Sequence, residues 1–196
     1  EEGKSVRDML ELALAGFQPD ILDSYHVTYK CDCSLERVEK MIRSQTAKQE
    51  QQLESFLARH DAANPFPEDV LLTADADDMG DGRPCHRMDI FRPREAKEAL
   101  PVLVNIHGGG FLLGKKEANR LFCADMCRCG FVVFCLEYPL VPDVDIFTVF
   151  RALTAGIERA AALAPDFGGD ASRLFLCGDS AGAYYAAALA CIADNG

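Results

Sequence analysis

One serine near the C-terminal end of the chain lies in a pattern suited to a nucleophile. Ser180 is the centre of the pentapeptide GDSAG at 178–182, between an apolar run at 173–177 and an alanine-rich stretch with helical spacing. The two glycines allow a sharp strand-to-helix turn, which exposes the serine at a helix N-terminus that stabilises developing negative charge. The pattern indicates a nucleophile elbow. The alternative is an ordinary turn whose small residues allow close packing.

A glycine-rich loop upstream supplies the second signal. His107 is followed by glycines at 108–110 and by Phe111, directly after the apolar run 101–106, a predicted buried strand. The tetrahedral intermediate of ester cleavage carries an oxyanion, which needs preorganised backbone N–H donors, and glycines let the backbone come close. Alone, the loop could be a phosphate-binding or structural turn. Together, two motifs that each follow a predicted strand favour a hydrolase fold.

Two further segments point to a known family. They are EYPLVPD at 137–143 and DASR at 170–173. With HGGGF and GDSAG, they resemble the hormone-sensitive-lipase-like family of α/β-hydrolases, which are carboxylesterases with an HGGG loop. Segment 137–143 departs from the family's E-Y-R-L-A-P-E at Pro139 and Val141. The resemblance covers about 70–196 and implies an α/β-hydrolase fold, with a mostly parallel sheet and helices on both faces.

The resemblance also implies a role for each motif residue. Ser180 would be the nucleophile of a two-step acyl transfer on small or medium-chain esters, with no cofactor and no metal. The backbone amides of the oxyanion hole would be those of Gly108, Gly109 and Ala181. His107 would hold the glycine loop. For Asp179 the residue type itself, at the start of a predicted helix, favours a role as helix cap over one in orienting a base. The glycines that support the motifs through their conformation are Gly110, Gly178 and Gly182.

The other half of a catalytic triad is missing from the sequence. The family carries an acid and then a histidine downstream of the serine, but Asp194 is the sole carboxylate after Ser180 and no histidine follows. A serine without a neighbouring base is a poor nucleophile at neutral pH. We expect a sheet that is incomplete on its C-terminal side. The alternatives are an enzyme completed elsewhere, a non-catalytic small-ligand binding protein of this fold, and an inactive truncated fragment.

The remaining sequence predicts the organisation of the chain. Helical spacing predicts helices over 5–17 and 34–60, with Ser34 as N-cap, and Asn64–Pro67 breaks helix. We therefore predict a helical N-terminal cap region at 1–67 and the N-terminal portion of the catalytic domain at 68–196. In the resembling family such helices cover the active site; a packing appendage or an interaction helix is the alternative. Further strands are expected at 70–73, 85–92 and 131–136, and helices at 117–129 and 147–163.

Several candidate sites have simpler explanations. Nine scattered cysteines favour free thiols in a reducing, cytoplasmic compartment, and the Cys31/Cys33 and Cys127/Cys129 pairs have poor zinc spacing. The acidic loop at 75–82 lacks EF-hand spacing, which favours a solvated hairpin turn over a calcium site. Three aromatic residues could line an acyl pocket or simply pack: Phe111, Tyr138 and Tyr184.

Composition limits the partners. A net charge of −11 argues against nucleic acid and anionic membrane surfaces, and no apolar run is long enough to span a bilayer. The resemblance implies a small-molecule ester as the partner, and the non-catalytic alternative implies another small hydrophobic ligand. An incomplete sheet would also expose an edge strand, which makes a homo-oligomer possible.

Overall fold

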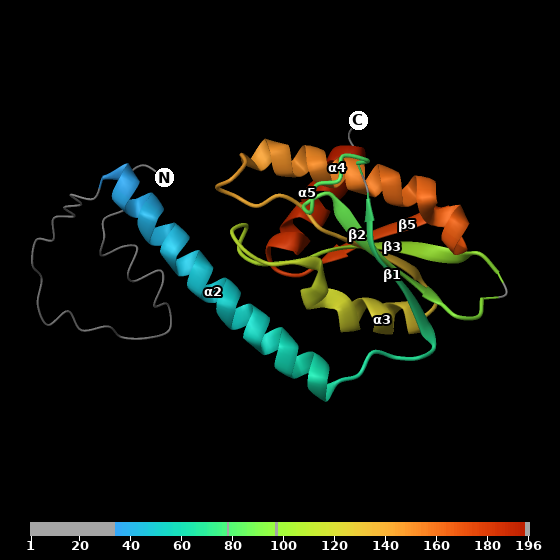
Figure 1. Ribbon diagram of the computed structural model, residues 1–196. Helices are drawn as coiled ribbons and strands as arrows, with labels where there is room; N and C mark the ends of the chain where they lie inside the picture. Colours follow the sequence, from blue (N-terminus) through green and yellow to red (C-terminus); the bar gives the residue numbers. More distant parts are fainter. Residues whose placement is uncertain (1–33, 78, 97, 195–196) are drawn as a thin grey trace, which may run out of the picture. The chain divides into compact units, whose positions relative to one another are not determined.

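The computed structural model describes residues 34–77, 79–96 and 98–194 (Figure 1). The helix predicted at 5–17, His26 and the Cys31/Cys33 pair lie outside these residues. The chain divides into two compact units, 1–38 and 39–196. The second unit contains the sheet and the HGGGF and GDSAG motifs.

From residue 100 onward, strands and helices alternate as the sequence predicts. The helices are α2 (Leu35–Ala63), η1 (Lys116–Asn119), α3 (Arg120–Arg128), α4 (Ile146–Leu163), η2 (Ala164–Phe167) and α5 (Ala181–Asp194). The strands are β1 (Val70–Asp77), β2 (Arg87–Pro93), β3 (Leu100–Ile106), β4 (Val132–Leu136) and β5 (Gly169–Gly178). No helix in the described ranges is both long enough and apolar enough to cross a bilayer.

Five strands form one sheet in the order β1-β2-β4-β3-β5. Strands β4, β3 and β5 run parallel, whereas β2 is antiparallel to both β1 and β4. Helix α3 connects β3 to β4, and α4 connects β4 to β5. Figure 1 shows α3 on one side of the sheet and α4 on the other. This arrangement confirms the predicted α/β-hydrolase fold class, with helices on both faces.

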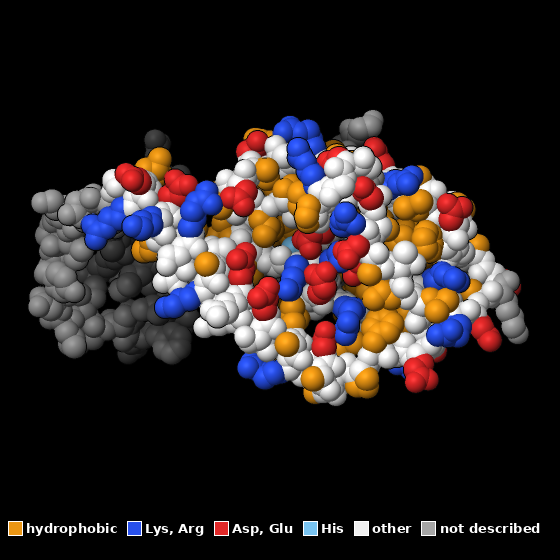
Figure 2. Space-filling view, viewed as in Figure 1, with side chains coloured by type: hydrophobic (Ala, Val, Ile, Leu, Met, Phe, Trp, Pro, Cys, Tyr) orange, Lys and Arg blue, Asp and Glu red, His pale blue; other side chains and the backbone are white. Residues whose placement is uncertain are grey.

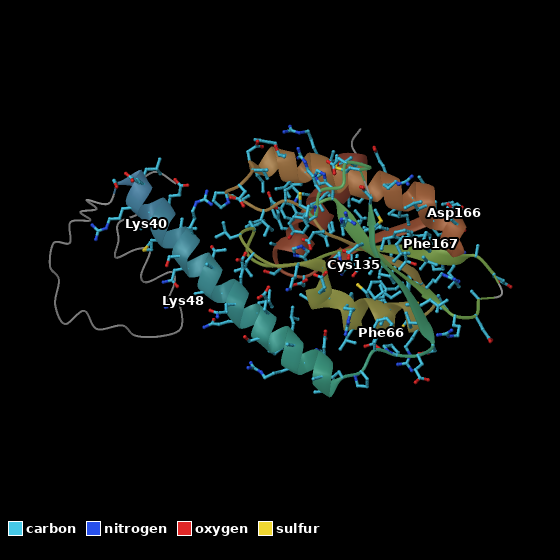
Figure 3. All side chains as sticks on the ribbon, in the orientation of Figure 1. Lys40, Lys48, Phe66, Cys135, Asp166 and Phe167 are labelled. Carbon is cyan, nitrogen blue, oxygen red and sulfur yellow. The ribbon has the colours of Figure 1, made fainter. Side chains whose placement is uncertain are left out.

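Alternation along β4 explains the two cores. Val132, Phe134 and Leu136 pack with the core under α4 and α5, whereas Val133 and Cys135 pack with the core under α3. All five side chains are buried, as expected for a strand covered on both faces. Figure 3 labels Cys135 within the body formed by the sheet and its helices. The cysteines of this second core are small buried hydrophobic residues.

Some boundaries differ from the predictions. The helix expected at 117–129 is split into η1 and α3. Strand β5 begins at Gly169, ahead of the apolar run at 173–177, because Gly169 pairs with Leu100 before the register shifts between Pro101 and Val102. At α2, the hydroxyl of Ser34 accepts a hydrogen bond from the Arg37 amide at 3.2 Å, which confirms the predicted N-cap.

The predicted hairpin turn between β1 and β2 is held by carboxylates. Asp77 accepts hydrogen bonds from the amides of Gly80 and Gly82 at 2.7 and 3.0 Å, and Asp81 accepts one from Arg83 at 3.0 Å. These acidic side chains therefore bind the loop's own backbone. Elsewhere, acidic and basic side chains are interspersed over the face shown in Figure 2.

Candidate active site

The nucleophile elbow has the backbone that its sequence predicts. Ser180 lies between the end of β5 and the start of α5, is exposed, and has φ +50°. This left-handed conformation costs a non-glycine residue roughly 1–3 kcal/mol and often marks functional sites. A Cβ on Gly182 would collide with the carbonyl oxygen of Ile106, so α5 can approach β3 only with glycine there. The serine is therefore held exposed at a helix N-terminus.

The glycine loop lies beside this elbow. Ile106, the last residue of β3, pairs with Gly178, the last residue of β5, so both motifs leave the same edge of the sheet. Gly109 has φ +133°, and a Cβ on it would collide with the carbonyl oxygen of Leu113. Register and sterics together bring the loop against the serine turn.

His107 is buried beneath the loop and is 1% exposed. Its Nδ1 lies 2.8 Å from the carbonyl oxygen of Gly108, and its Nε2 lies 2.8 Å from Oε1 of Glu137. The ring stacks on Tyr138 with centroids 4.3 Å apart, and the Tyr138 hydroxyl donates to the carbonyl oxygen of His107 at 2.6 Å. Burial raises the pKa of Tyr138. Since both imidazole nitrogens face these oxygens, His107 acts as a support for the loop.

Asp179 has a different role from the predicted one. Its Oδ1 accepts hydrogen bonds from the Gly108 amide and from Nδ2 of Asn119, both at 2.9 Å. The first turn of α5 is instead satisfied by the Asp179 backbone carbonyl, which accepts from Gly182 at 2.8 Å. The prediction of a side-chain cap is therefore wrong. The Gly108 amide, predicted as an oxyanion donor, is directed at the Asp179 carboxylate.

The other described histidines lie elsewhere. His86 is 7% exposed, and its Nδ1 lies 2.8 Å from Oδ2 of Asp81 in the loop before β2. Two strands, β4 and β3, separate β2 from β5. His60 lies on α2 and stacks on Phe56. The structure thus places neither histidine beside Ser180.

The three aromatic residues proposed for an acyl pocket differ in their exposure and contacts. Tyr138 is 1% exposed and belongs to the core, whereas Tyr184 is 55% exposed. Phe111 packs edge-on against Tyr184 and Tyr185, with centroid distances of 5.7 and 5.5 Å. Tyr185 was not singled out from the sequence, because an alanine-rich helix gives no sign of which tyrosine faces inward. Burial raises its pKa to about 12.

A buried charge cluster was also missed by sequence reasoning. Nζ of Lys116 lies 2.8 Å from Asp89, 2.9 Å from Asp75 and 2.7 Å from Glu117, and its amide donates to Oε2 of Glu137 at 3.1 Å. Burial by itself lowers the pKa of Lys116, but hydrogen bonds to the carboxylates outweigh it and hold the pKa above its usual value. Nothing in the residue spacing signals this cluster, which joins β1 and β2 to the chain after the glycine loop.

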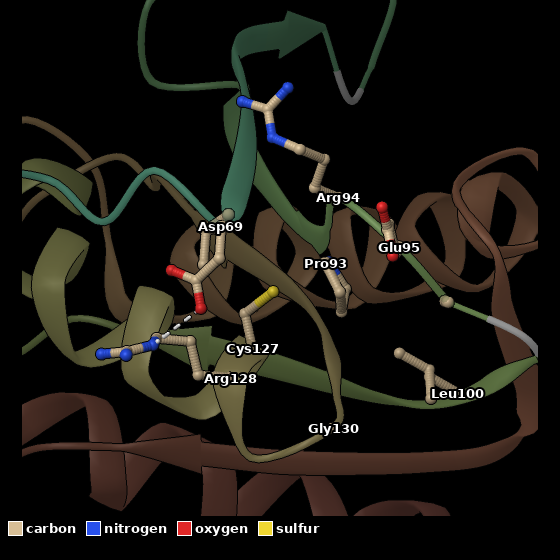
Figure 4. Close-up of a pocket in the computed structure, with 10 residues that line it drawn as sticks. Asp69, Pro93, Arg94, Glu95, Leu100, Cys127, Arg128 and Gly130 are labelled. Atoms are coloured by element: carbon tan, nitrogen blue, oxygen red, sulfur yellow. Dashed lines mark hydrogen bonds and ion pairs between the residues drawn. The ribbon is translucent and has the colours of Figure 1, made fainter.

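One cavity lies at the end of the sheet opposite the serine and the glycine loop. It is an open cleft of about 550 Å³ near the starts of β1 and β3 and the end of antiparallel β2. Figure 4 shows its lining, in which Nε of Arg128 lies 3.0 Å from Asp69, with Cys127 beside them. Because Ser180 follows the carboxyl end of β5, this cavity is not part of the serine site.

Comparison with known proteins gives two different matches along the chain. Residues 103–196 match the family model of the alpha/beta hydrolase fold, and residues 1–62 match the model of the Hsp33 protein. A probable isoprenylcysteine alpha-carbonyl methylesterase of Oryza sativa subsp. japonica is 30% identical over 105 residues, 54% of this chain and 25% of the relative.

Esterases recur among the other matches. A versiconal hemiacetal acetate esterase of Dothistroma septosporum is 31% identical over 122 residues, which is 61% of this chain and 35% of that protein. The crystal structure of esterase B from Lactobacillus rhamnosis superposes with a TM-score of 0.74 at 27% identity, covering 79% of this chain and 50% of that one. The chain thus spans a quarter to about half of the length of these proteins.

Proposed function

The chain belongs, through residues 103–196, to the α/β-hydrolase fold family, and from this premise we propose that it is the nucleophile-bearing part of a serine carboxylesterase. The observation that carries the proposal is the pairing of Ile106 with Gly178, which brings the glycine loop against the strained, exposed Ser180. Esterases and lipases among the relatives support the reaction class.

The proposed chemistry is acyl transfer. The Ser180 hydroxyl attacks the carbonyl carbon of a small or medium-chain ester, and its proton passes to a base. The amides of Gly109 and Ala181, with the N-terminus of α5, stabilise the oxyanion as it forms. The alcohol leaves with a proton, and water then releases the acid from Ser180. His60, His86 and His107 each contact other groups, so we propose that the base is a group other than these three histidines.

A second candidate function follows from the contacts of the histidines. An α/β-hydrolase domain whose described histidines all contact other groups could bind a small hydrophobic ligand without cleaving it. Saturable binding that survives Ser180→Ala, with no acyl-enzyme, would favour this function over the esterase.

The proposed cap at 1–67 has mixed support. Arg43 on α2 pairs with Asp143 of segment 137–143 at 3.1 Å, which ties the helix to a catalytic-domain loop. However, residues 1–62 match a different family. That match favours the alternative of an appendage.

Chemical rescue tests the esterase proposal directly. We would measure p-nitrophenolate release from p-nitrophenyl acetate with added imidazole, which stands in for the missing base, and subtract the reaction of imidazole alone. Removing a triad member leaves acceleration on the order of 10³–10⁴ over water, so a Ser180-dependent burst of up to one equivalent is expected.

Two variants interpret the burst. Ser180→Ala should abolish both the burst and the acetyl adduct seen by mass spectrometry. Ser55→Ala, on the exposed surface of α2, should leave them unchanged. Equal release by Ser180→Ala and the parent chain would reject Ser180 as the nucleophile.

A further inference from the structure

Asn119 lies at a helix start but does not cap it. It ends η1 and occupies the N-cap position of α3, with φ −100° and no side-chain hydrogen bond to the helix. Asparagine is among the most favourable N-cap residues because its side-chain oxygen normally accepts from the first turn. The Asn119 side chain is used elsewhere.

Its amide group joins two other side chains. Nδ2 of Asn119 donates to Oδ1 of Asn105 and to Oδ1 of Asp179, both at 2.9 Å. A side-chain amide carries two N–H protons, so both bonds can form at once. The first partner lies in the buried sheet and the second lies beside the nucleophile.

Asn105 is a fixed anchor for this arrangement. It is 1% exposed within β3, and its Nδ2 donates to the Cys177 sulfur at 3.3 Å. Its Oδ1 also accepts from the Cys135 thiol at 3.4 Å. Contacts from β4 and β5 therefore hold the oxygen that Asn119 binds. Because Asn105 is fixed in this way, the two hydrogen bonds of Asn119 fix the Asp179 carboxylate relative to the sheet.

Asp179 in turn contacts the glycine loop. The same Oδ1 that binds Asn119 accepts from the Gly108 amide at 2.9 Å. A Cβ on Gly108 would collide with this carboxylate, so the loop and the carboxylate fit together closely. The orientation of the Gly108 peptide in turn determines where the neighbouring Gly109 amide points.

We propose that Asn119 is a positioning residue for the glycine loop: it orients the Asp179 carboxylate, which holds the Gly108 amide and thereby directs the Gly109 amide. The benefit for catalysis rests on the proposed esterase function. The hydrogen-bond relay itself can be tested without any turnover.

The test uses two substitutions of Asn119 in the full chain. Asn119→Asp keeps the shape, removes both donors and places a second carboxylate beside Asp179. Asn119→Ser keeps a favourable N-cap for α3 but is too short to bind both partners, so it guards against a loss of folding. Asn64→Asp, which removes an amide donor to the His60 carbonyl at the end of α2, is the matched control.

The readout is amide NMR of the loop. We expect the Gly108 amide proton to shift upfield and its hydrogen exchange to become at least about tenfold faster in both Asn119 variants, as befits the loss of a charge-assisted bond. The shift and exchange rate of the Val104 amide within β3 should stay unchanged in the Asn119 variants. In the Asn64→Asp control, all amides of the glycine loop should keep the shifts and exchange rates of the parent chain. Unaltered Gly108 and Gly109 signals in either folded Asn119 variant would overturn the proposal.

A kinetic arm separates this proposal from the esterase proposal. In the imidazole-rescued reaction, both Asn119 variants should lower the rate of acylation at saturating ester. The ester concentration that gives half of the maximal rate should stay unchanged, since the loop amides act on the oxyanion and not on the bound ester. If the parent chain shows no Ser180-dependent reaction while the Gly108 signal responds as predicted, the esterase proposal fails and the relay stands. If acylation is Ser180-dependent and indifferent to Asn119, the positioning role fails alone.

Discussion

Among the strands that the structure describes, β1 and β5 are the outer ones, each with one edge that no other described strand pairs with, but they are built differently. Strand β1 has a register shift between Thr73 and Ala76, where Asp75 has φ +55°. In β5 the irregularity is confined to the start, and the stretch Leu174–Gly178 pairs regularly with β3. Bulges and charges oppose edge pairing, whereas regular apolar edges promote it. The β1 edge therefore ends the sheet, and the β5 edge can extend it.

The surface around β5 agrees with this difference. A groove of about 890 Å³ lies between α4, β5 and α5, and its lining is mostly apolar. Phe175 is 53% exposed and Ile192 is 63% exposed beside it. Only half of esterase B superposes on this chain, so that structure contains a further half beyond the matched part. The regular edge of β5 and the apolar groove beside it therefore form a surface suited to strand pairing.

The largest effect is expected on the β1 side, at Lys116. Lys116→Met should lower the free energy of unfolding by about 3–5 kcal/mol, because it leaves the buried Asp89 carboxylate without its counter-charge. Urea unfolding followed by circular dichroism measures this. Lys115→Met is the control, since the Lys115–Glu54 pair is largely exposed and should be worth less than about 1 kcal/mol. Similar losses in the two variants would show that the buried cluster does not stabilise this edge.

The next effect concerns self-association at β5. At 100 μM the chain should sediment as a dimer or larger species, because two antiparallel copies of β5 can pair Leu174 with Leu176 around Phe175. Phe175→Lys should weaken the association at least about tenfold by placing two like charges opposite each other. Ala74→Lys, at an exposed position of β1, should change nothing. A parent chain that sediments as a monomer would reject the contrast between the two edges.

Sequence reasoning found the backbone of the site more readily than its supporting contacts. Glycine spacing after apolar strands predicted the elbow and the loop, because a positive φ or a close approach leaves few other residue choices. It predicted the wrong partner for Asp179, because the choice between capping and binding Gly108 depends on the Ile106–Gly178 register.

The side chains that brace the site carried no sequence signal. Asn119 and Asn105 are fourteen residues apart on separate elements, and their contact exists only once α3 has packed on the sheet. Lys116 lies just before the helix predicted at 117–129, and nothing in its sequence position indicates burial. It is nevertheless 3% exposed, because three carboxylates from different segments converge on it. Local periodicity predicts elements, whereas long-range polar contacts depend on tertiary packing.

The smallest expected effect distinguishes the irregular start of β5 from its regular end. Asp170 accepts hydrogen bonds from the Ser172 hydroxyl at 2.6 Å and from Nε of Arg173 at 2.7 Å. These bonds, with Ser172 first, lower the pKa of Asp170 from 3.8 to about 2. A lowered folded-state pKa contributes stability that is present above the unfolded value of 3.8 and is lost as pH falls toward 2.

Asp170→Asn should therefore reduce the urea midpoint slightly at pH 5 and flatten its decline between pH 4 and 3. The effect is small because the carboxylate is exposed to solvent, which screens its interactions. Asp166→Asn, in η2, is the matched control and should keep the parent's pH profile. If Asp170→Asn also raised self-association, Asp170 would protect the start of β5 from pairing, and the open edge would be confined to Leu174–Gly178. An unchanged sedimentation profile would instead assign that protection to the bulge itself, because the backbone irregularity persists without the charge.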